Sequence, residues 1–377
     1  MSRYTKFCFG RRITGLRRKL QYIILSVLLV VSMNGCAFTK ASPRYGLITD
    51  SSGVGKTGPN ADIMNTLLQI AKQNESEARA YEAATDRASD LNAQFDQAAR
   101  DGVGLAFTCG DRAGEALIRS QNEHRKIKYA LIGDYAGSEE LKLENNAMRC
   151  VFRYEDMGFI AGYVAVMSGY RSLAFVAGAY DDMSKRIVSG YVQGAEYAAE
   201  KLHLEEGAVS VTGTYAGTAE LSPLRMADAL AFYNSGAEIV MGVGKNMSAA
   251  VSKAAEYAER MFIATDIDLS ATDTNCIFSA CPMFSGVVNT VVKYYETKDA
   301  FPEGKTIECG ITEDAVGLAA DNTKLRTFTD ENYRTLKSDV NEGKAVISSE
   351  ETTKGNAYVS FRIVNAPSSE ENTGSAS

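Results

Sequence analysis

The chain has 377 residues, of which 45% are hydrophobic and 23% charged, the composition of an ordinary globular protein with room for a large core. The first 35 residues carry 7 of the 40 basic residues and no acid, so the rest has 33 basic and 47 acidic residues, a net charge of −14. Such a surface repels nucleic acid and anionic lipid headgroups, so we expect no nucleic-acid partner.

The N-terminal segment predicts an export signal. Its basic residues precede an apolar run, Leu20–Met33, which is shorter than the ~20 residues that a membrane-spanning helix needs. The following Met-Asn-Gly-Cys, which ends at Cys36, resembles the lipobox of bacterial lipoproteins, in which cleavage leaves a lipidated cysteine. We therefore expect a signal peptide over residues 1–35, lipidation at Cys36 and a tether over 36–44. The alternative is an uncleaved anchor in which Cys36 has no role.

The remaining cysteines and histidines favour neither a disulfide framework nor a metal site. The odd number of cysteines after Cys36 argues against complete pairing, and none of them forms a C-x-x-C motif. With His124 and His203 as the only histidines, a zinc site of Cys and His is not expected, and we expect no metal and no cofactor. The cysteines are interpreted as small buried hydrophobic side chains: Cys109, Cys150, Cys276, Cys281 and Cys309.

The first half of the body alternates between apolar strands and amphipathic helices. Strands are expected at 45–50, 103–110 and 128–134, with helices at 61–74, 89–102 and 114–125. Ser89 is placed to cap the second helix and Gly102 to end it. This alternation predicts a parallel sheet with helices on both faces.

The pattern then repeats. Residues 101–111 have a counterpart at 235–246, and the strand that ends at Asp134 has one that ends at Asp266. Two α/β units of one plan are the simplest explanation. Ligands of open α/β sheets bind at the carboxyl ends of the strands, so two such lobes predict a cleft between them that a hinge can close.

Polar or glycine residues follow the predicted strands at these ends. The candidates are Asp50, Gly110, Asp134, Gly178, Gly244 and Asp266. Each alone is an ordinary loop residue, but together they fall at equivalent places in two lobes. For Asp50 and Asp266 the alternative role is a helix N-cap.

The stretch LITDSSGVGKTGPN, Leu47–Asn60, looks like a phosphate-binding loop. Its Gly55-Lys56-Thr57 supplies the end of G-x-x-x-x-G-K-[ST], but Asp50 stands where the first glycine belongs. A carboxylate there directs negative charge into a cradle meant for phosphate. An NTPase therefore remains only a remote alternative.

The segment instead resembles the opening of the basic membrane protein family, whose members include purine nucleoside receptor lipoproteins of ABC importers. Thr49, Asp50, Gly53 and Asn60 match its Thr-Asp strand end, glycine turn and helix start. Further similar segments follow in the same order as far as about residue 320: FRYEDMGFIAGYVA, LAFVAG, SGYVQGAEYAAE, TGTY, GAEIVMGVG, TDID and FPEGKTIECGITEDAVGLA.

The resemblance implies an α/β fold of two Rossmann-like lobes joined by a hinge, periplasmic binding protein type I-like, with the ligand cleft between the lobes. We expect lobe 1 over 45–150, with about 280–300 returning to it, and lobe 2 over 151–279, with about 301–346. Residues 347–377 are expected to hold one strand, AYVSFRIV, and a tail that is disordered over 366–377.

The resemblance also assigns ligand residues, with Asp50 and Asn60 in the first lobe and Asp266 in the second. The carboxylates are acceptors that can hold ribose hydroxyls or a base N–H, and the amide of Asn60 offers both a donor and an acceptor. The complete expected ligand-binding set is Asp50, Asn60, Gly110, Asp134, Tyr180, Gly244, Lys245 and Asp266.

Departures from the family pattern predict a remodelled pocket. Pro59 replaces an aromatic residue before Asn60, Pro282 stands about where members place a lysine, and Lys245 takes the place of a second glycine. Replacement stacking on a base can come from Tyr135, Tyr180 or Tyr215, although each of these is also explained by packing or surface exposure.

The leading hypothesis is a lipid-anchored receptor on the extracytoplasmic face of the cell membrane. It captures a nucleoside or similar polar molecule and delivers it to an ABC permease. An enzyme is not expected, because two histidines give no Ser-His-Asp set and Glu155-Asp156 is better explained as a helix start. The alternative is a sensory or surface-interaction module that uses the same clamp to signal to a membrane kinase.

Overall fold

The computed structural model describes residues 44–364 except 138–139, 320–323 and 326. The expected signal peptide, the lipidation site Cys36 and the expected disordered tail lie outside the described residues. Among the residues described, no helix has both the length and the apolar character needed to cross a membrane.

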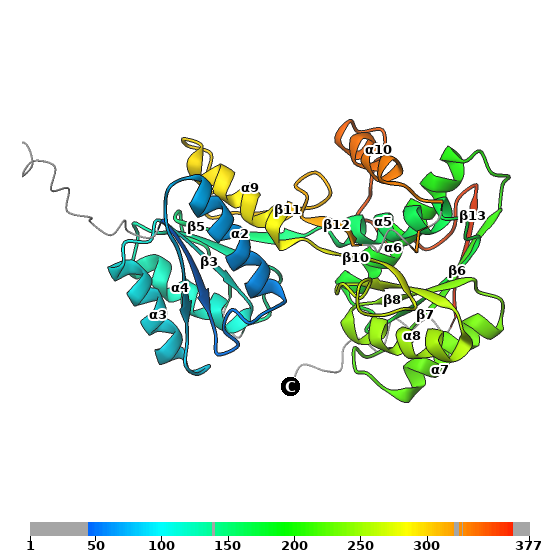
Figure 1. The fold of residues 1–377 in the computed structure, drawn as a ribbon, viewed down its shortest axis with the longest axis horizontal. Coiled ribbons are helices and arrows are strands. Elements are labelled where there is room, and N and C mark those ends of the chain that lie inside the picture. Colours follow the sequence, from blue (N-terminus) through cyan, green and yellow to red (C-terminus); the bar gives the residue numbers. More distant parts are fainter. Residues whose placement is uncertain (1–43, 138–139, 320–323, 326, 365–377) are drawn as a thin grey trace, which may run out of the picture. The chain divides into compact units, whose positions relative to one another are not determined.

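The first of two sheets has six parallel strands in the order β11-β5-β4-β3-β1-β2 (Figure 1). Helices α2 and α9 pack together on it, and α3 packs with α4. The strands are β1 Tyr45–Thr49, β2 Ala78–Glu82, β3 Leu105–Cys109, β4 Lys128–Ile132, β5 Ala147–Phe152 and β11 Thr306–Cys309. The helices are α2 Pro59–Gln73, α3 Ala88–Arg100, α4 Asp111–Glu123 and α9 Phe284–Glu296.

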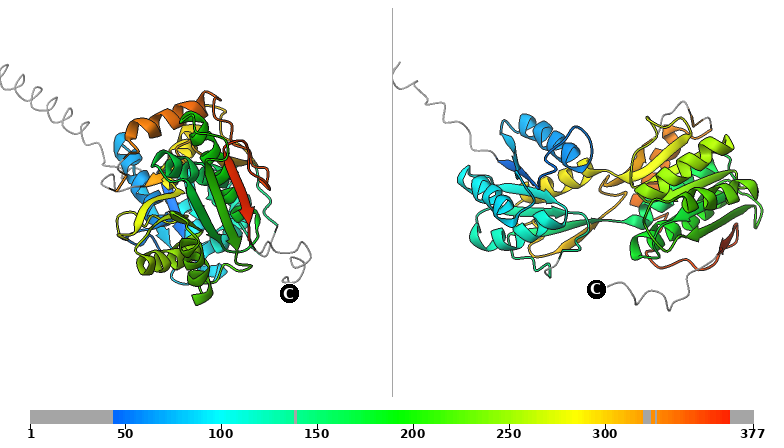
Figure 2. Two further views of the ribbon diagram at one scale, coloured as in Figure 1. Left: turned by 90° about the vertical axis from the view of Figure 1, so that its right-hand side faces the viewer. Right: turned by 90° about the horizontal axis from the view of Figure 1, so that it is seen from below.

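The second sheet has seven strands in the order β12-β10-β9-β8-β6-β7-β13, all parallel except β12, which runs antiparallel to β10. Figure 2 shows β13, in red, at its outer edge. The strands are β6 Ser172–Ala177, β7 Val209–Tyr215, β8 Ile239–Val243, β9 Met261–Thr265, β10 Cys276–Pro282, β12 Val316–Ala319 and β13 Val359–Ile363. The helices are α5 Tyr154–Met167, α6 Asp182–Lys201, α7 Pro223–Asn234, α8 Lys245–Ala258 and α10 Asp330–Asn341.

The two sheets confirm the predicted α/β class and the repeated plan. The equivalent glycines Gly110 and Gly244 begin α4 and α8 with nearly the same backbone, φ 92° and ψ 162° against φ 86° and ψ 161°. Only glycine adopts such angles without strain, because a Cβ at positive φ collides with the backbone. The same glycine turn from strand to helix therefore occurs at equivalent strand ends of the two sheets.

Two local details differ from the sequence expectations. Ser89 does not cap α3, because that helix begins at Ala88 after Arg87, and the Ser89 hydroxyl instead donates to the neighbouring Asp90. β11 pairs with β5 in the first sheet, whereas the sequence placed residues 301–346 with the second lobe. Since β11 has only four residues and little apolar periodicity, its pairing depends on tertiary contacts rather than on its own pattern.

Helices α5 and α6 pack with their backbones in close approach. A Cβ on Gly158 would lie 1.9 Å from the carbonyl oxygen of Ile187, and one on Gly190 would lie 1.9 Å from that of Glu155. Gly162 and Gly194 are placed similarly, at 2.1 Å from Tyr191 O and 2.0 Å from Phe159 O. Four glycines, two per helix at a spacing of four, are thus required for this contact.

Three described segments connect the sheets and bond to one another. Between β5 and α5, the N–H of Arg153 donates to Cys309 O at 3.0 Å. Between β10 and α9, Met283 N–H donates to Ala315 O at 2.8 Å. Between β11 and β12, Ile311 N–H donates to Asp156 Oδ2 at 2.9 Å. Parallel connections held together in this way are the expected geometry of a hinge.

Candidate solute-binding site

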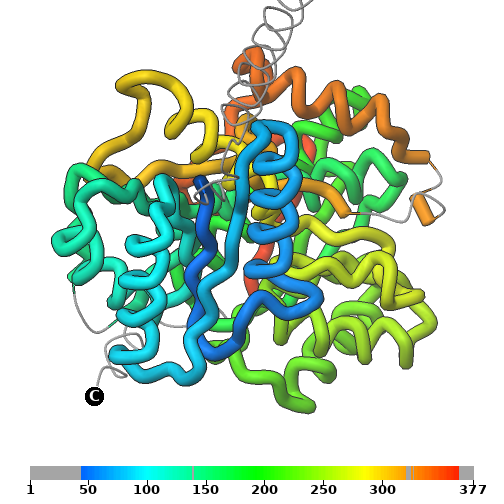
Figure 3. The backbone as a smooth tube through the Cα atoms, turned by 60° about the vertical axis from the view of Figure 1, so that its left-hand side comes forward, coloured from blue at the N-terminus to red at the C-terminus, as the bar shows by residue number. Residues whose placement is uncertain are grey.

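The first group of predicted site residues lies where β1 ends. Asp50 follows the buried Thr49, and its Oδ1 accepts hydrogen bonds from the backbone N–H (3.0 Å) and the hydroxyl of Ser52. Asn60, in the first turn of α2, donates from Nδ2 to the carbonyl oxygen of Gly53 at 2.9 Å. Both side chains therefore organise the same turn, which Figure 3 follows in blue from β1 into α2.

This turn does not form a phosphate cradle. Its Ser52 N–H is already taken by the Asp50 carboxylate, and the Lys56 side chain is exposed. The N-cap of α2 is Gly58, so the alternative role of Asp50 as a helix cap is also excluded. What the turn presents is a carboxylate and an amide, which suit hydroxyl and N–H groups better than phosphate.

The second group lies at the end of β4. Asp134 receives a hydrogen bond from the hydroxyl of Tyr154 at 2.5 Å, and its other oxygen lies 3.4 Å from Arg149. Tyr154 is the first residue of α5, so this bond joins a strand end of the first sheet to a helix of the second. Burial, the bond to Asp134 and the charges of Asp134 and Asp266 raise the pKa of Tyr154, which keeps it a neutral donor.

The third group lies where β8 and β9 end. Asp266 follows Thr265 and has a left-handed backbone with φ 68°, which is uncommon for a residue with a side chain. The Thr265 hydroxyl donates to Gly242 O and accepts from Gly244 N–H, both at 2.9 Å, and so fixes the turn into α8. Asp266 is therefore held beside the start of α8, whose N-cap is Gly244, and its carboxylate accepts a hydrogen bond from the N–H of Lys245 in the first turn of that helix.

The surroundings of Asp266 shift its pKa and that of a nearby cysteine. The side chain is partly exposed, and the protein packed around it raises its pKa, while the N–H and ammonium of Lys245 act in the opposite direction. The pKa of the Cys281 thiol, at the end of β10, is affected by the same carboxylate. Burial raises the pKa of Cys281 to about 12, and the carboxylates of Asp268, Asp266 and Asp62 contribute to the rise.

The predicted stacking residue Tyr180 is engaged by its own protein. Its ring meets Tyr215 edge to face at 4.8 Å between centroids, and Lys185 Nζ lies 4.8 Å from its centroid. Its hydroxyl donates to Glu351, and this bond, together with burial and the charge of Glu351, raises the pKa of Tyr180 to about 12. The C-terminal segment thus reaches a strand end near the site, which the sequence did not indicate.

Comparisons with known proteins decide the family. A family described as ABC transporter substrate-binding protein PnrA-like matches residues 46–375. The chain belongs to this family. Basic membrane protein D of Borreliella burgdorferi is 26% identical over 238 residues, which cover 62% of this chain and 67% of that protein. Basic membrane protein B of Borrelia garinii subsp. bavariensis is 24% identical over 312 residues, or 81% of this chain and 89% of that protein.

Solved structures share the fold of this PnrA-like chain. A solute-binding protein of an ABC transporter system from Conexibacter woesei gives a TM-score of 0.61 at 15% identity and covers 82% of this chain and 99% of that one. A transcriptional activator of the comK gene from Bacillus halodurans gives 0.58 at 18% identity, over 79% and 96%. The predicted family and the fold of periplasmic binding proteins are confirmed, and the protein is an ABC-transporter solute-binding protein.

Sequence reasoning about this PnrA-like protein missed Tyr154 and the charges behind it. Arg186 of α6 lies 2.6 Å from the fully buried Glu155 and 2.9 Å from Glu308 of β11. The opposite charges in FRYEDM are the available signal, although a helix start also accounts for them. α5 does start there, and Glu155 also pairs with Arg186, whose second ion pair, with Glu308 of β11, reaches the first sheet.

Proposed function

We propose that the protein is a lipid-anchored extracytoplasmic receptor that binds a nucleoside or a related polar solute and delivers it to an ABC permease. Membership of a solute-binding family supports the transport role, and the Met-Asn-Gly-Cys motif before residue 37 supports the anchor. Binding requires no chemistry on the solute. Closure follows if the solute has a higher affinity for the closed state than for the open one.

The observation that carries the proposal is the arrangement around Tyr154. Its hydroxyl bonds to Asp134, the carboxylate at a strand end of the first sheet, although Tyr154 itself begins α5 of the second sheet, and Asp266 follows strand β9 of that second sheet. A solute that approaches both sheets would therefore meet acceptors from each, together with Asp50 and Asn60 at the end of β1. Ribose hydroxyls and base N–H groups are donors that match such acceptors.

Titration calorimetry with full-length protein in detergent and a panel of nucleosides, bases and sugars tests this proposal. We expect at least one nucleoside to bind, and Asp50→Asn or Asp266→Asn to weaken it by about 10- to 100-fold, because each removes a charged acceptor worth about 1.5–3 kcal/mol. Asp299→Asn is the matched control. Asp299 is exposed, lies before β11 at the opposite edge of the first sheet, and has a left-handed backbone that asparagine also tolerates.

Two outcomes would overturn the proposal. If no compound of the panel binds more tightly than about 1 mM, which corresponds to roughly −4 kcal/mol, the protein is not a receptor for this class. If Asp299→Asn weakens binding as much as Asp50→Asn, the site lies elsewhere. Uptake of the bound compound by cells with and without the protein separates import from the sensory alternative, in which binding is retained but uptake is unchanged.

A further inference from the structure

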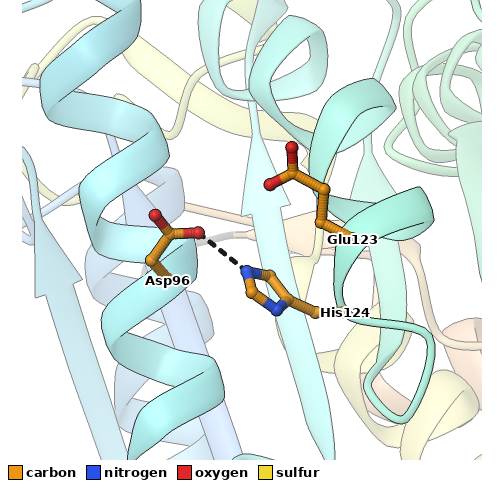
Figure 4. A group of neighbouring side chains, drawn as sticks. All are labelled: Asp96, Glu123 and His124. Carbon is orange, nitrogen blue, oxygen red and sulfur yellow. Dashed lines mark hydrogen bonds and ion pairs between the residues drawn. The ribbon is translucent and has the colours of Figure 1, made fainter.

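A cluster of metal-ligand side chains lies on the first sheet's outer helices, away from the strand ends. Asp96 projects from α3, and Glu123 and His124 lie at the end of α4 (Figure 4). One ligand atom from each of the three residues lies within 4.8 Å of the others. His124 Nε2 and Asp96 Oδ1 are 2.7 Å apart.

The local charge favours a cation. Glu123 is the last residue of α4, where the helix dipole is negative, and the last turn of this helix contains no basic residue. Arg119 supplies one positive charge, with its guanidinium 2.5 Å from Glu123 and 4.0 Å from Asp96. Arg119 is shared by the two carboxylates, and Arg125 and Lys126, which follow His124, have exposed side chains. A divalent ion in place of the Arg119 guanidinium would be attracted more strongly by the two carboxylates than the single charge of the arginine is.

We propose that Asp96, Glu123 and His124 form a site for a divalent transition-metal ion of the zinc class. An imidazole nitrogen with two carboxylate oxygens is a donor set that zinc accepts, with water completing the tetrahedron, whereas magnesium and calcium prefer oxygen alone. Arg119 must turn away as the ion enters, and the bound ion then ties α3 to α4. The sequence does not predict this site, because the argument against zinc there concerns only sites made of cysteine and histidine.

The chain offers an internal control because it has only two histidines. In full-length protein with ¹⁵N-labelled histidine, zinc chloride is titrated while the ring resonances of His124 and His203 are followed by NMR. His203 is exposed and lies beyond the end of α6, outside the cluster. We expect the His124 resonances to shift with saturation and those of His203 to stay in place.

Variants then test the ligand set. Asp96→Asn and Glu123→Gln should each weaken zinc binding by at least about tenfold, since each replaces a charged ligand with a neutral amide. Arg119→Gln should tighten binding by about tenfold, because it removes the competing cation. His203→Ala should leave the His124 titration unchanged. Thermal melting without metal establishes that each variant is folded.

The opposite results would overturn the site. If both histidines respond alike, zinc binds histidine without a built site. If Arg119→Gln weakens binding or leaves it unchanged while the carboxylate variants have no effect, the three side chains form only a surface ion-pair cluster. Zinc should raise the melting temperature of the wild type but not that of Asp96→Asn. This difference would support the inference that the bound ion links α3 to α4.

Discussion

At the scale of single residues, burial decides what each charge does. Glu155 is fully buried and contacts Arg186 at 2.6 Å and Arg153 at 3.2 Å, whereas Glu308 contacts the same Arg186 at 2.9 Å but is 47% exposed. Water screens the exposed pair, so it contributes little to stability. Removing the buried partner leaves an arginine without its desolvated counter-ion, which is strongly destabilising.

This contrast predicts unequal effects for two chemically identical changes. Glu155→Gln should lower the free energy of unfolding by about 3 kcal/mol, because it breaks a buried pair. Glu308→Gln, which neutralises the exposed partner of the same arginine, should lower it by less than about 1 kcal/mol. Urea denaturation monitored by circular dichroism measures both. Equal losses would contradict the assignment of the ion-pair energy to the buried side of Arg186.

At the scale of elements, the close packing of α5 against α6 requires glycine, which has no side chain, at the positions where the two helices touch. A Cβ at Gly162 would lie 2.1 Å from Tyr191 O and 2.7 Å from Ala195 N, both backbone atoms. Backbone atoms of a helix cannot move out of the way of a new Cβ as easily as a side chain, which can rotate. The helices would therefore have to separate, and the core beneath them would lose its packing.

Gly162→Ala should accordingly destabilise the protein by about 2–3 kcal/mol through overpacking, despite the better helix propensity of alanine. Gly114→Ala in α4 is the control. Its Cβ would lie 2.8 Å from the Tyr135 ring, a side chain that can move, so the expected change is within about 1 kcal/mol. Thermal and urea unfolding of both variants measure the difference. A stable Gly162→Ala protein would show that the helices separate without loss.

At the scale of the whole molecule, three segments connect the two sheets. The sheets can therefore move relative to each other only if these segments, which are hydrogen-bonded to one another, bend. The contacts Arg153–Cys309, Met283–Ala315 and Asp156–Ile311 couple these segments, so they are expected to move together. Burial raises the pKa of Asp156, while the N–H of Ile311 and the charge of Arg153 oppose the rise.

If the proposed solute closes the protein, small-angle X-ray scattering should show a smaller radius of gyration with saturating nucleoside than without it. The physical reason is the solute's higher affinity for the closed state, in which both lobes contact it. Asp266→Asn at the same nucleoside concentration should give a radius between the liganded and unliganded values of the wild type, because its site is incompletely occupied. Tight binding by the wild type with no change in radius would exclude closure as the mechanism.

Much of the fold follows from local pattern. Alternating apolar strands and amphipathic helices predicted the α/β class, and the repeat predicted that Gly110 and Gly244 end equivalent strands, where the structure shows them also to be the N-caps of α4 and α8. These features are readable because burial imposes a period on each element and because certain turns require glycine. The lobe boundaries, the ligand residues and the lipid anchor stay predictions.

By itself, the sequence determined the elements, the family and the strand ends where polar residues gather. Only the tertiary structure decided that β11 joins the first sheet, that Tyr154 bonds to Asp134, that Arg186 links Glu155 to Glu308, and that Asp96 meets His124. These contacts join residues that are 20 to 157 positions apart, or edge strands with no distinctive pattern of their own. No periodicity within a segment records such a contact, because it depends on how the complete chain packs.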